Sequence, residues 1–441
     1  MSYDPLITPA VDPSGAPPDT YWRTTCQPTY FASLDGDHQT DFLIIGGGYT
    51  GLSAALELTE NQSGDVSVID SHSMGYGCAG RNAGFVLNSS GRLGPLALTK
   101  KYGADTARSI QNEYDNAAEQ LLRNIDKYHI DCDLTSGPYY KLAHTGKQAR
   151  VQVDTLKSLS RQFGSQARVL DSKMLQQHLS IQGFYGATVQ PGYGLNPLKL
   201  VDGLACAAQR SGARLFAKTP ALALKQNTTG YTVWTPTGRI SAKKVLIASN
   251  AYSSKQFHQS INNRQFAVQS SILVTAPLNA GELAGIGLDA PATLMDTRMM
   301  KYYYRLLPDN RILFGGRGEV TGKAASAGQA RLFNAMTTSF PVLKHKPVSH
   351  FWSGWVSVAL DSLPRVYFDQ KQNLGYAMGY CGAGVSFANF AGRRLAQQAM
   401  GMSDLPDIPL YTTALPRYPL ARLRRFGLRA LYAWARVAER L

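Results

Sequence analysis

The sequence predicts an α/β fold, and the stretch from residue 41 to residue 69 carries that prediction. Residues 41–45 form a short, mostly apolar run that stops at three glycines, Gly46 to Gly48. The apolar residues that follow, from Leu52 to Leu58, recur at helical spacing rather than in alternation. Residues 66–69 have the composition of a second strand. Strand, tight turn, helix and strand together form a βαβ unit, the building block of parallel sheets.

The glycines of this unit predict a dinucleotide site. Gly46, Gly48 and Gly51 have the G-x-G-x-x-G spacing. The first permits the turn, the second lets a pyrophosphate approach the backbone, and the third lets helix pack on strand. Asp70 follows the second strand roughly 20 residues later, where a ribose hydroxyl needs a carboxylate. The alternative is a plain βαβ unit with an incidental glycine turn and a solvated acid.

Composition and charge limit the possible functions. The chain has 441 residues, enough for about two or three domains with ample core. Its net charge of +15 is compatible with nucleic acid, an anionic membrane surface or acidic substrates as partners. No nucleic-acid-binding motif is present and the charge is spread out, except in the C-terminal tail. We therefore favour an ordinary basic surface and expect no nucleic acid.

Cysteine usage and the N-terminal sequence indicate a cytoplasmic protein. The five cysteines are odd in number and form no Cys-x-x-Cys pair, which argues against disulfides and a metal site. Residues 1–28 lack the basic start and apolar core of a signal peptide. The longest apolar stretch, residues 42–58, is too short and too rich in glycine to span a membrane.

Nucleotide-binding pieces recur near residues 45, 80, 248 and 382, which indicates a domain assembled from separated segments. The expected helices cover residues 104–128, 147–163, 196–210, 325–340 and 386–400, with strands at 231–235 and 244–250 and a hairpin turning at Asp309-Asn310. The expected domains are an arm (1–40), a nucleotide-binding domain (41–100, 185–255 and 350–410), an inserted domain (101–184 and 256–349) and a basic C-terminal helix (411–441).

Four motifs, in this order, resemble the D-amino-acid-oxidase-like FAD-dependent oxidoreductases. They are Ile44 to Ser53, Gly80 to Gly84, Val245 to Tyr252 and Gly379 to Val385, the last after Trp355 and Asp361 to Pro364. Within that superfamily the sequence is most similar to γ-glutamylputrescine oxidase-like amine oxidases. The resemblance spans residues 40–400, and the order of the motifs is more specific than any one of them.

The resemblance implies a p-hydroxybenzoate-hydroxylase-like fold, with a Rossmann-like FAD-binding domain and an inserted antiparallel-sheet substrate domain. It implies non-covalent FAD and oxidation of an amine C–N bond to an imine by hydride transfer. Oxygen as the acceptor gives hydrogen peroxide, and water converts the imine to an aldehyde or ketone. One alternative is a membrane-associated dehydrogenase of an amino or imino acid, such as pipecolate or a D-amino acid, that reduces quinone. Another is a flavoprotein that acts by binding alone.

The resemblance also implies roles for individual residues. The expected FAD contacts are Gly46, Gly48, Gly51, Asp70, Arg81, Asn82, Ala248, Gly382, Gly384 and Val385. The alternative for Arg81 and Asn82 is a loop held by its own side-chain hydrogen bonds. The expected catalytic or substrate-lining residues are Arg317, Tyr302, Tyr304 and Trp355. Arg317 is a surface residue in the alternative, and the two tyrosines, which share one face of a strand, belong to the core.

Departures from the family pattern bear on the substrate. Asp70 replaces a usual Glu, Ala383 replaces a common His, and Cys78-Ala79 replaces Ala-Ser. Ser386 stands near the position of a lysine that holds the carboxylate of small N-methyl amino acids in relatives. A buried carboxylate without a cationic partner is costly. We therefore expect an amine whose other polar groups lie away from the reacting carbon, such as a polyamine or its acylated derivative.

The C-terminal tail combines arginines with an apolar stripe. The arginines are Arg422, Arg424, Arg425, Arg429, Arg436 and Arg440, and the stripe comprises Leu423, Phe426, Ala430, Ala433 and Val437. This pattern fits either a helix on a membrane surface or a helix docked on the protein with solvated arginines. We favour the docked helix and keep peripheral membrane contact as the alternative.

Overall fold

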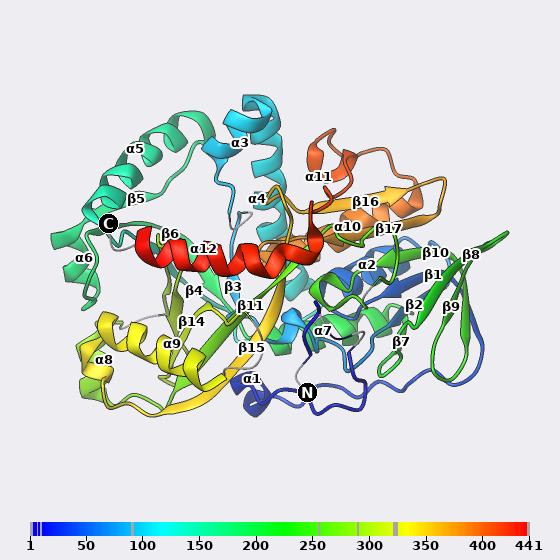
Figure 1. Cartoon of the computed structure of the whole chain (residues 1–441), viewed down its shortest axis with the longest axis horizontal. Helices are drawn as coiled ribbons and strands as arrows, with labels where there is room; N and C mark the ends of the chain where they lie inside the picture. Colours follow the sequence, from blue (N-terminus) through cyan, green and yellow to red (C-terminus); the bar gives the residue numbers. More distant parts are fainter. Residues whose placement is uncertain are drawn as a thin grey trace.

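The computed structural model describes residues 3–6, 8, 11–89, 92–254, 256–288, 291–320 and 325–438. Two sheets lie side by side, one in each half of the view in Figure 1. The first sheet contains the predicted βαβ unit, and the second is mostly antiparallel. The predicted α/β class is confirmed.

The first sheet has a parallel centre in the order β17-β10-β1-β2-β7. Its strands are β1 (His38–Ile45), β2 (Val66–Ile69), β7 (Arg214–Phe216), β8 (Ala223–Asn227), β9 (Gly230–Trp234), β10 (Arg239–Ile247), β16 (Arg365–Asp369) and β17 (Leu374–Met378). The β8–β9 hairpin and β16 add antiparallel pairs. Ile44 packs into the core beneath the helices and Ile45 into the core on the opposite face. Burial on both faces explains the nearly continuous apolar run.

Helices α2 (Tyr49–Glu60), α7 (Pro197–Arg210) and α10 (Gly384–Met400) cover one face of the first sheet. The long helix α4 (Ala104–Lys127), with α3 (Pro95–Tyr102), packs its apolar side into the same core. The expected division placed residues 101–127 in the inserted domain. That assignment is corrected, since Ile110, Tyr114 and Leu121 are buried with residues of α2 and α10.

The second sheet runs in the order β15-β11-β14-β13-β12-β4-β6-β3, with β5 beside β6. Its strands are β3 (Phe85–Val86), β4 (Thr135–Leu142), β5 (Arg168–Asp171), β6 (Gly186–Gly194), β11 (Phe266–Thr275), β12 (Thr293–Asp296), β13 (Tyr303–Leu306), β14 (Ile312–Arg317) and β15 (Val348–Val358). We expected residues 185–194 in the nucleotide-binding domain. They form β6 instead, because this segment pairs with β4 and β5 along its length.

One face of the second sheet is covered by helices, and the other faces the first sheet's domain. The covering elements include α6 (Ser172–His178), α8 (Ala280–Ile286) and α9 (Ala325–Ser339), with η3 (Pro341–Leu343). Helix α5 (Gly146–Phe163) contributes no residue to the core on this face. The core on this face includes Tyr304, Phe314, Leu332 and Phe340. The expected hairpin is present as β13 and β14, and Asn310 in its turn has a φ of 60°.

The two ends of the chain meet on the surface of the molecule. The N-terminal segment contains α1 (Tyr21–Thr25), and the C-terminal segment contains α11 (Pro409–Thr412), η4 (Ala421–Leu423) and α12 (Arg424–Ala438). Figure 1 shows α12 as the red helix lying across the front of the second sheet. Among the described helices, none is long and apolar enough to cross a bilayer. Arg440 of the predicted tail lies outside the described residues.

Candidate active site

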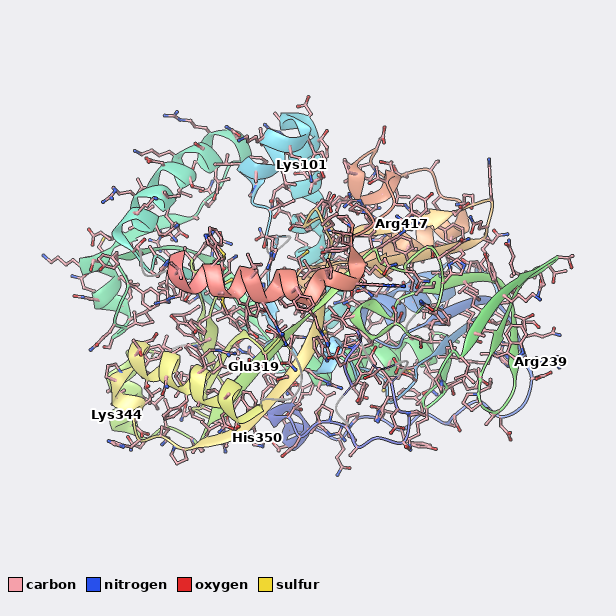
Figure 2. The ribbon with its side chains drawn as sticks, in the orientation of Figure 1. Lys101, Arg239, Glu319, Lys344, His350 and Arg417 are labelled. Atoms are coloured by element: carbon pink, nitrogen blue, oxygen red, sulfur yellow. The ribbon has the colours of Figure 1, made fainter. Side chains whose placement is uncertain are left out.

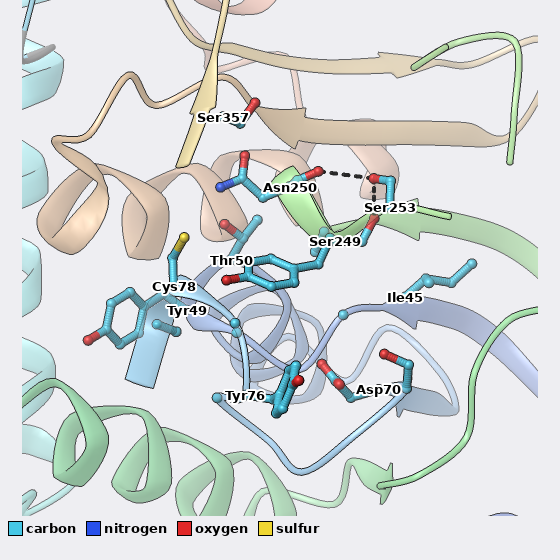
Figure 3. Close-up of a pocket in the computed structure, with 18 of the residues that line it drawn as sticks. Ile45, Tyr49, Thr50, Asp70, Tyr76, Cys78, Ser249, Asn250, Ser253 and Ser357 are labelled. Atoms are coloured by element: carbon cyan, nitrogen blue, oxygen red, sulfur yellow. Dashed lines mark hydrogen bonds between the residues drawn. The ribbon is translucent and has the colours of Figure 1, made fainter. Parts of the chain in front are cut away.

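A large cavity opens at the carboxyl ends of β1, β2 and β10, and Figure 3 shows part of its wall. Ligands bind at this edge of open α/β sheets. The space between the protein atoms is about 1300 Å³, counting solvent at the mouth. Asp70, Thr219 and Val11 line one end, and Tyr380 and Val385 line the other. The wall of the cavity therefore combines residues of the N-terminal arm, the βαβ unit and α10.

The three glycines of the motif have different physical roles. Gly46 has a φ of +118°, and a Cβ there would lie 2.7 Å from the carbonyl oxygen of Ala248. A Cβ on Gly51 would lie 1.9 Å from the carbonyl oxygen of Gly46. A Cβ on Gly48, by contrast, would meet only Ala79 Cβ, at 3.6 Å. The fold itself therefore requires Gly46 and Gly51, whereas the backbone at Gly48 borders open cavity.

The first turn of α2 offers backbone amides to this cavity. Gly48 is the N-cap of α2, and no side chain caps the helix there. Tyr49 and Thr50 line the cavity wall beside it. Uncapped N–H groups and the positive end of the helix dipole form an anion site.

Asp70 lies at the end of β2, and both of its oxygens accept backbone hydrogen bonds. Oδ2 accepts from the amide of Gly47 at 2.8 Å, and Oδ1 from the amide of His72 at 2.8 Å. Burial raises the pKa of this carboxyl, and the two hydrogen bonds oppose that shift. Each carboxylate oxygen has two lone pairs, so each retains capacity for a further donor in the cavity.

The loop after η1 (Cys78–Gly80) is held by its own side chains, as the alternative described. The Asn82 amide donates to the carbonyls of Cys78 and Ala79 and accepts from the amide of Gly84. Asn82 also lines the cavity. Arg81 Nε donates to the carbonyl of Tyr76 at 2.7 Å, while its Nη2 is buried with no hydrogen-bond partner in the described chain. Arg81 thus holds an unsatisfied buried donor beside the cavity.

The third glycine cluster forms the other end of the cavity. Gly382, Gly384 and Val385 line it, and Ala248 lies across from them at the end of β10. Gly382 has a φ of +92°, and a Cβ there would meet nothing within 4 Å. The N-cap of α10 is Ala383, and no side chain caps this helix either. A second uncapped helix N-terminus therefore begins at the cavity.

Arg317, at the end of β14, lies half-buried close to this glycine cluster. Burial lowers the pKa of its guanidinium, and so does the nearby charge of Arg92. Tyr432, Tyr303 and Cys381 are close enough to interact with it electrostatically. Within the described residues no acidic side chain pairs with Arg317.

Tyr302 and Tyr304 do share one face, but it is the face turned away from the cavity. The Tyr304 ring stacks on Phe314, with centroids 4.9 Å apart, and its edge meets Phe340. Tyr302 also packs against Phe314. The expectation that this pair lines the substrate pocket is therefore corrected. Tyr303 between them points to the opposite face, where its hydroxyl lies 2.8 Å from Ser270 Oγ.

Trp355, which was expected to line the substrate pocket, is instead buried away from the cavity. Its indole is 5% exposed and donates to the carbonyl of Tyr3 at 2.9 Å. It packs with Ala251 and Ala267 rather than lining the cavity. The next two residues of β15, Val356 and Ser357, line the cavity instead.

Comparison with known proteins identifies the family. A family model described as FAD dependent oxidoreductase (DAO) matches residues 41–398. The chain belongs to this family. The resemblance stated from the sequence is thereby confirmed, and the protein is an FAD-dependent oxidoreductase.

Several relatives of this oxidoreductase are similar over most of their length. Gamma-glutamylputrescine oxidoreductase of Escherichia coli K12 is 31% identical over 88% of this chain and 89% of its own. Glycine oxidase of Geobacillus kaustophilus is 24% identical over 81% of this chain and 92% of its own. The crystal structure of a glycine oxidase from that organism has a TM-score of 0.71 at 20% identity, covering 87% of this chain and 100% of that chain. L-Proline dehydrogenase from P. horikoshii has a TM-score of 0.67 at 17% identity, covering 86% and 96%.

The cavity of this oxidoreductase fits the FAD that its family binds. Gly48 and Gly382 leave the space that a cofactor's atoms would fill, and two helix N-termini are uncapped there. Asp70 retains acceptor capacity, and Arg81 has an unsatisfied donor. Eight of the ten residues expected to contact the cofactor line this cavity. Arg81 lies beside the lining residues Tyr76 and Asn82, and Gly51 serves the strand–helix contact instead.

A group of cations on the cavity side of the second sheet was missed from the sequence. The pKa of Lys301 is lowered to about 8, first by burial and then by the charges of Lys141, Arg317 and Arg92. These residues come from β4, β14 and two loops, so no local spacing connects them. The sequence does contain a sign of which tyrosine faces the cavity. Gly315 lies opposite Tyr303 on the neighbouring strand, and a Cβ at Gly315 would lie 2.1 Å from the Tyr303 ring. That glycine indicates which tyrosine lies on the cavity face.

Proposed function

We propose that this oxidoreductase removes a hydride from the carbon beside an amine nitrogen and yields an imine. Oxygen is the proposed electron acceptor, with hydrogen peroxide as product, and water hydrolyses the imine to an aldehyde or ketone. The proposal is supported by family membership and by the relatives' names, a gamma-glutamylputrescine oxidoreductase and glycine oxidases. Bound FAD would supply the redox chemistry, and the protein would supply placement and electrostatics.

The proposed cofactor contacts follow from the cavity wall. The backbone at Gly48 and the first turn of α2 would hold the pyrophosphate, and Asp70 would accept from the ribose. Gly382, Gly384 and Val385 would lie against the flavin ring. The N-terminus of α10 and the unpaired Arg317 would then stabilise negative charge that develops there.

The cofactor is proposed to be bound without a covalent link, because both nearby thiols are engaged and protonated. Burial raises the pKa of Cys78 to about 12, and its thiol donates to the carbonyl of Trp355. The Cys381 thiol is buried and donates to the carbonyl of Gly379 at 3.1 Å. A thiol attacks as the thiolate, so neither is prepared to form a thioether. Acid precipitation should leave the yellow flavin in the supernatant; a yellow pellet would contradict this proposal.

The substrate is proposed to be a linear amine whose far end is acylated and carries a carboxylate. The cation group of Lys301, Lys141, Arg317 and Arg92 carries this proposal. Like charges in a partly buried site repel the second ammonium of a free diamine and attract a carboxylate. Ser386, the residue that replaces the lysine of N-methyl amino acid oxidases, donates to the carbonyl of Leu87 and is fully buried. It is therefore not an anchor for a small α-amino acid.

An anaerobic screen tests the proposal. Flavin absorbance is followed after mixing with γ-glutamylputrescine, putrescine, N-methylglycine and a cyclic imino acid. We expect the acylated acidic amine to reduce the flavin at least tenfold faster than the others. If N-methylglycine or the imino acid reacts fastest, the substrate proposal is wrong. If no amine bleaches the flavin, the enzyme proposal fails as well.

A second candidate function is a membrane-associated dehydrogenase of an amino or imino acid that reduces quinone. An apolar, solvent-exposed side of α12 favours it. The peroxide yield per substrate, with and without a soluble quinone analogue, separates the two candidates. A yield near one that the quinone leaves unchanged supports the oxidase. The five free cysteines support a reducing compartment, and we propose the cytoplasm.

A further inference from the structure

Helix α12 buries one side and exposes a second, apolar side. Leu428, Tyr432 and Ala435 are buried against the body of the protein. The exposed residues follow i, i+3 and i+4 spacing on the opposite side, which places them in one stripe. This stripe, the α12 stripe, begins at Leu423, the last residue of η4 (52% exposed), and continues along α12 with Phe426 (67%), Ala430, Trp434 (58%) and Val437 (59%). Figure 1 shows that α12 lies in front of the other elements, so the stripe has open access to solvent.

The stripe is not needed to hold the helix in place. Arg424 Nη1 donates to the carbonyl of Gln265 at 2.6 Å, and Arg425 pairs with Asp4. These two contacts and the buried side attach α12 to the body. Single exposed apolar residues are ordinary, but a contiguous row of large ones marks an interaction surface.

The charged side chains beside the stripe are all positive in η4 and in the described part of α12. Arg422 and Arg429 are exposed, have no acidic partner among the described residues, and are seven residues apart on one flank of the stripe. Residues 420–438 contain no Asp or Glu. Arg417, labelled in Figure 2, is exposed in the segment that leads into α12.

The acids found close to the helix are already paired. Asp4 pairs with Arg425, and Glu319 pairs with Arg331. Tyr432 of α12 is close enough to interact electrostatically with four charged side chains, three of them positive. They are Arg317, Arg92, Arg331 and Glu319. The surface around α12 therefore keeps a positive field next to an apolar, tryptophan-containing stripe.

We propose that the α12 stripe binds the surface of an anionic lipid bilayer. Phe426, Trp434 and Val437 enter the interface between headgroups and acyl chains, and Arg422 and Arg429 pair with lipid phosphates. A second copy of this chain is a poorer occupant. Two such helices would bring unpaired arginines together on molecules that each carry a net charge of +15. The inference is independent of the electron acceptor and of the amine oxidised.

Vesicle co-sedimentation of the FAD-loaded protein tests the proposal. Vesicles of phosphatidylcholine alone are compared with equal mixtures of phosphatidylcholine and phosphatidylglycerol. We expect at least tenfold stronger binding to the mixed vesicles. The variant Phe426→Asp/Trp434→Asp should lose at least tenfold of that binding, and Arg422→Glu/Arg429→Glu should lose about as much.

Matched controls separate this surface from the general basicity of the protein. Arg108→Glu/Arg161→Glu changes the net charge equally at exposed positions on α4 and α5, and Tyr185→Asp changes another exposed aromatic residue. Both control proteins should bind within twofold of the parent protein. Flavin content and thermal unfolding must match across the set, so that lost binding does not reflect lost folding.

Three outcomes overturn the proposal. Equal binding to neutral and mixed vesicles removes the role of charge. Equal losses in the control and α12 variants show that general basicity is responsible. A dimer in solution that Phe426→Asp/Trp434→Asp converts to a monomer, with no vesicle binding by the parent protein, assigns the stripe to a second copy instead.

Discussion

The carboxylate of Asp4 pairs with the guanidinium of Arg425, and this contact joins the two ends of the chain. The residues are 421 positions apart, and both side chains are largely buried. Beside them, the Tyr3 ring stacks on Tyr252 with centroids 5.4 Å apart. Val11, a little further along the arm, lines the cofactor cavity. Helix α12 therefore holds the start of the arm, and Val11 of the same arm lines the cavity.

Breaking this ion pair should weaken FAD binding from a distance. Arg425→Ala leaves the Asp4 carboxylate buried without its partner, which should destabilise the closed arm by about 1–3 kcal/mol. The expected result is faster release of FAD, measured by the return of free-flavin fluorescence on dilution. Asp4→Asn/Arg425→Gln, which leaves no unpaired charge, should restore much of the retention. Arg425→Ala with unchanged FAD release would show that the arm does not close the site.

Substitutions at two glycines of the first turn should have different effects, one on cofactor binding and the other on folding. Gly48→Ala has room for its methyl group in the protein alone, so the chain should fold and lose FAD affinity. Gly48→Val should abolish binding. Gly51→Ala should prevent folding, because its Cβ would overlap the Gly46 carbonyl. Circular dichroism and flavin content distinguish the two cases, and a folded, yellow Gly51→Ala protein would refute the assignment.

Asp70→Ala should weaken FAD binding by about 1.5–3 kcal/mol, the value of hydrogen bonds to a charged group. The proposed bond to ribose requires the ionised carboxylate, and burial raises the pKa of Asp70. Affinity should therefore fall as the pH drops, beginning at a higher pH than for an ordinary aspartate. Titration of FAD at several pH values measures this, and Asp70→Asn should show a flat profile. A wild-type profile as flat as that of Asp70→Asn would argue against the ribose contact.

Lys301 should give the substrate preference a pH dependence. Its pKa of about 8 means that the cation group loses charge as the pH rises through 8. The ratio of kcat/KM for a carboxylate-bearing acylated amine to that for its neutral amide should fall over this range. Taking a ratio cancels the titration of the reacting amine. Lys301→Gln should lower the ratio at pH 7 and remove the transition, whereas Lys173→Gln on α6 should preserve both.

The tyrosines of β13 should differ in a way that reports which face each occupies. The Tyr304 hydroxyl is buried with no partner among the described residues. Tyr304→Phe should therefore keep activity and raise the free energy of unfolding by about 1 kcal/mol. Tyr303→Phe removes the contact with Ser270 Oγ on the cavity side and should alter the rate of flavin reduction. If Tyr304→Phe altered flavin reduction and Tyr303→Phe did not, the substrate pocket would lie on the face that Tyr304 occupies.

Local patterns predicted the elements of the fold well because their causes are local. Residues 66–69 form the strand expected of them, and the helix expected at 104–128 is α4. Both follow from spacing and composition within one segment. The glycine turn was likewise predictable, since Gly46 is required by its close approach to Ala248 and Gly51 by its close approach to Gly46.

The errors arise where distant segments decide the outcome. Alternation shows that Tyr302 and Tyr304 share a face, but packing of α9 and Phe340 determines which face is core. Residues 186–194 join the second sheet because β4 and β5 supply their hydrogen-bond partners. The cation group around Lys301 depends on four separate segments. None of these relationships leaves a periodic signal along the chain.

The order in which the cavity wall is assembled has a consequence for biosynthesis. Its lining runs from Val11 to Ala388, and the start of the N-terminal arm is held by Arg425, so the ribosome must make nearly the whole chain first. Chains are synthesised at about 5–20 residues per second. The nascent protein therefore spends most of its synthesis unable to retain FAD. A chain truncated before α12 should therefore have the complete cavity wall and yet retain FAD less well, because it lacks the Arg425 contact that holds the arm.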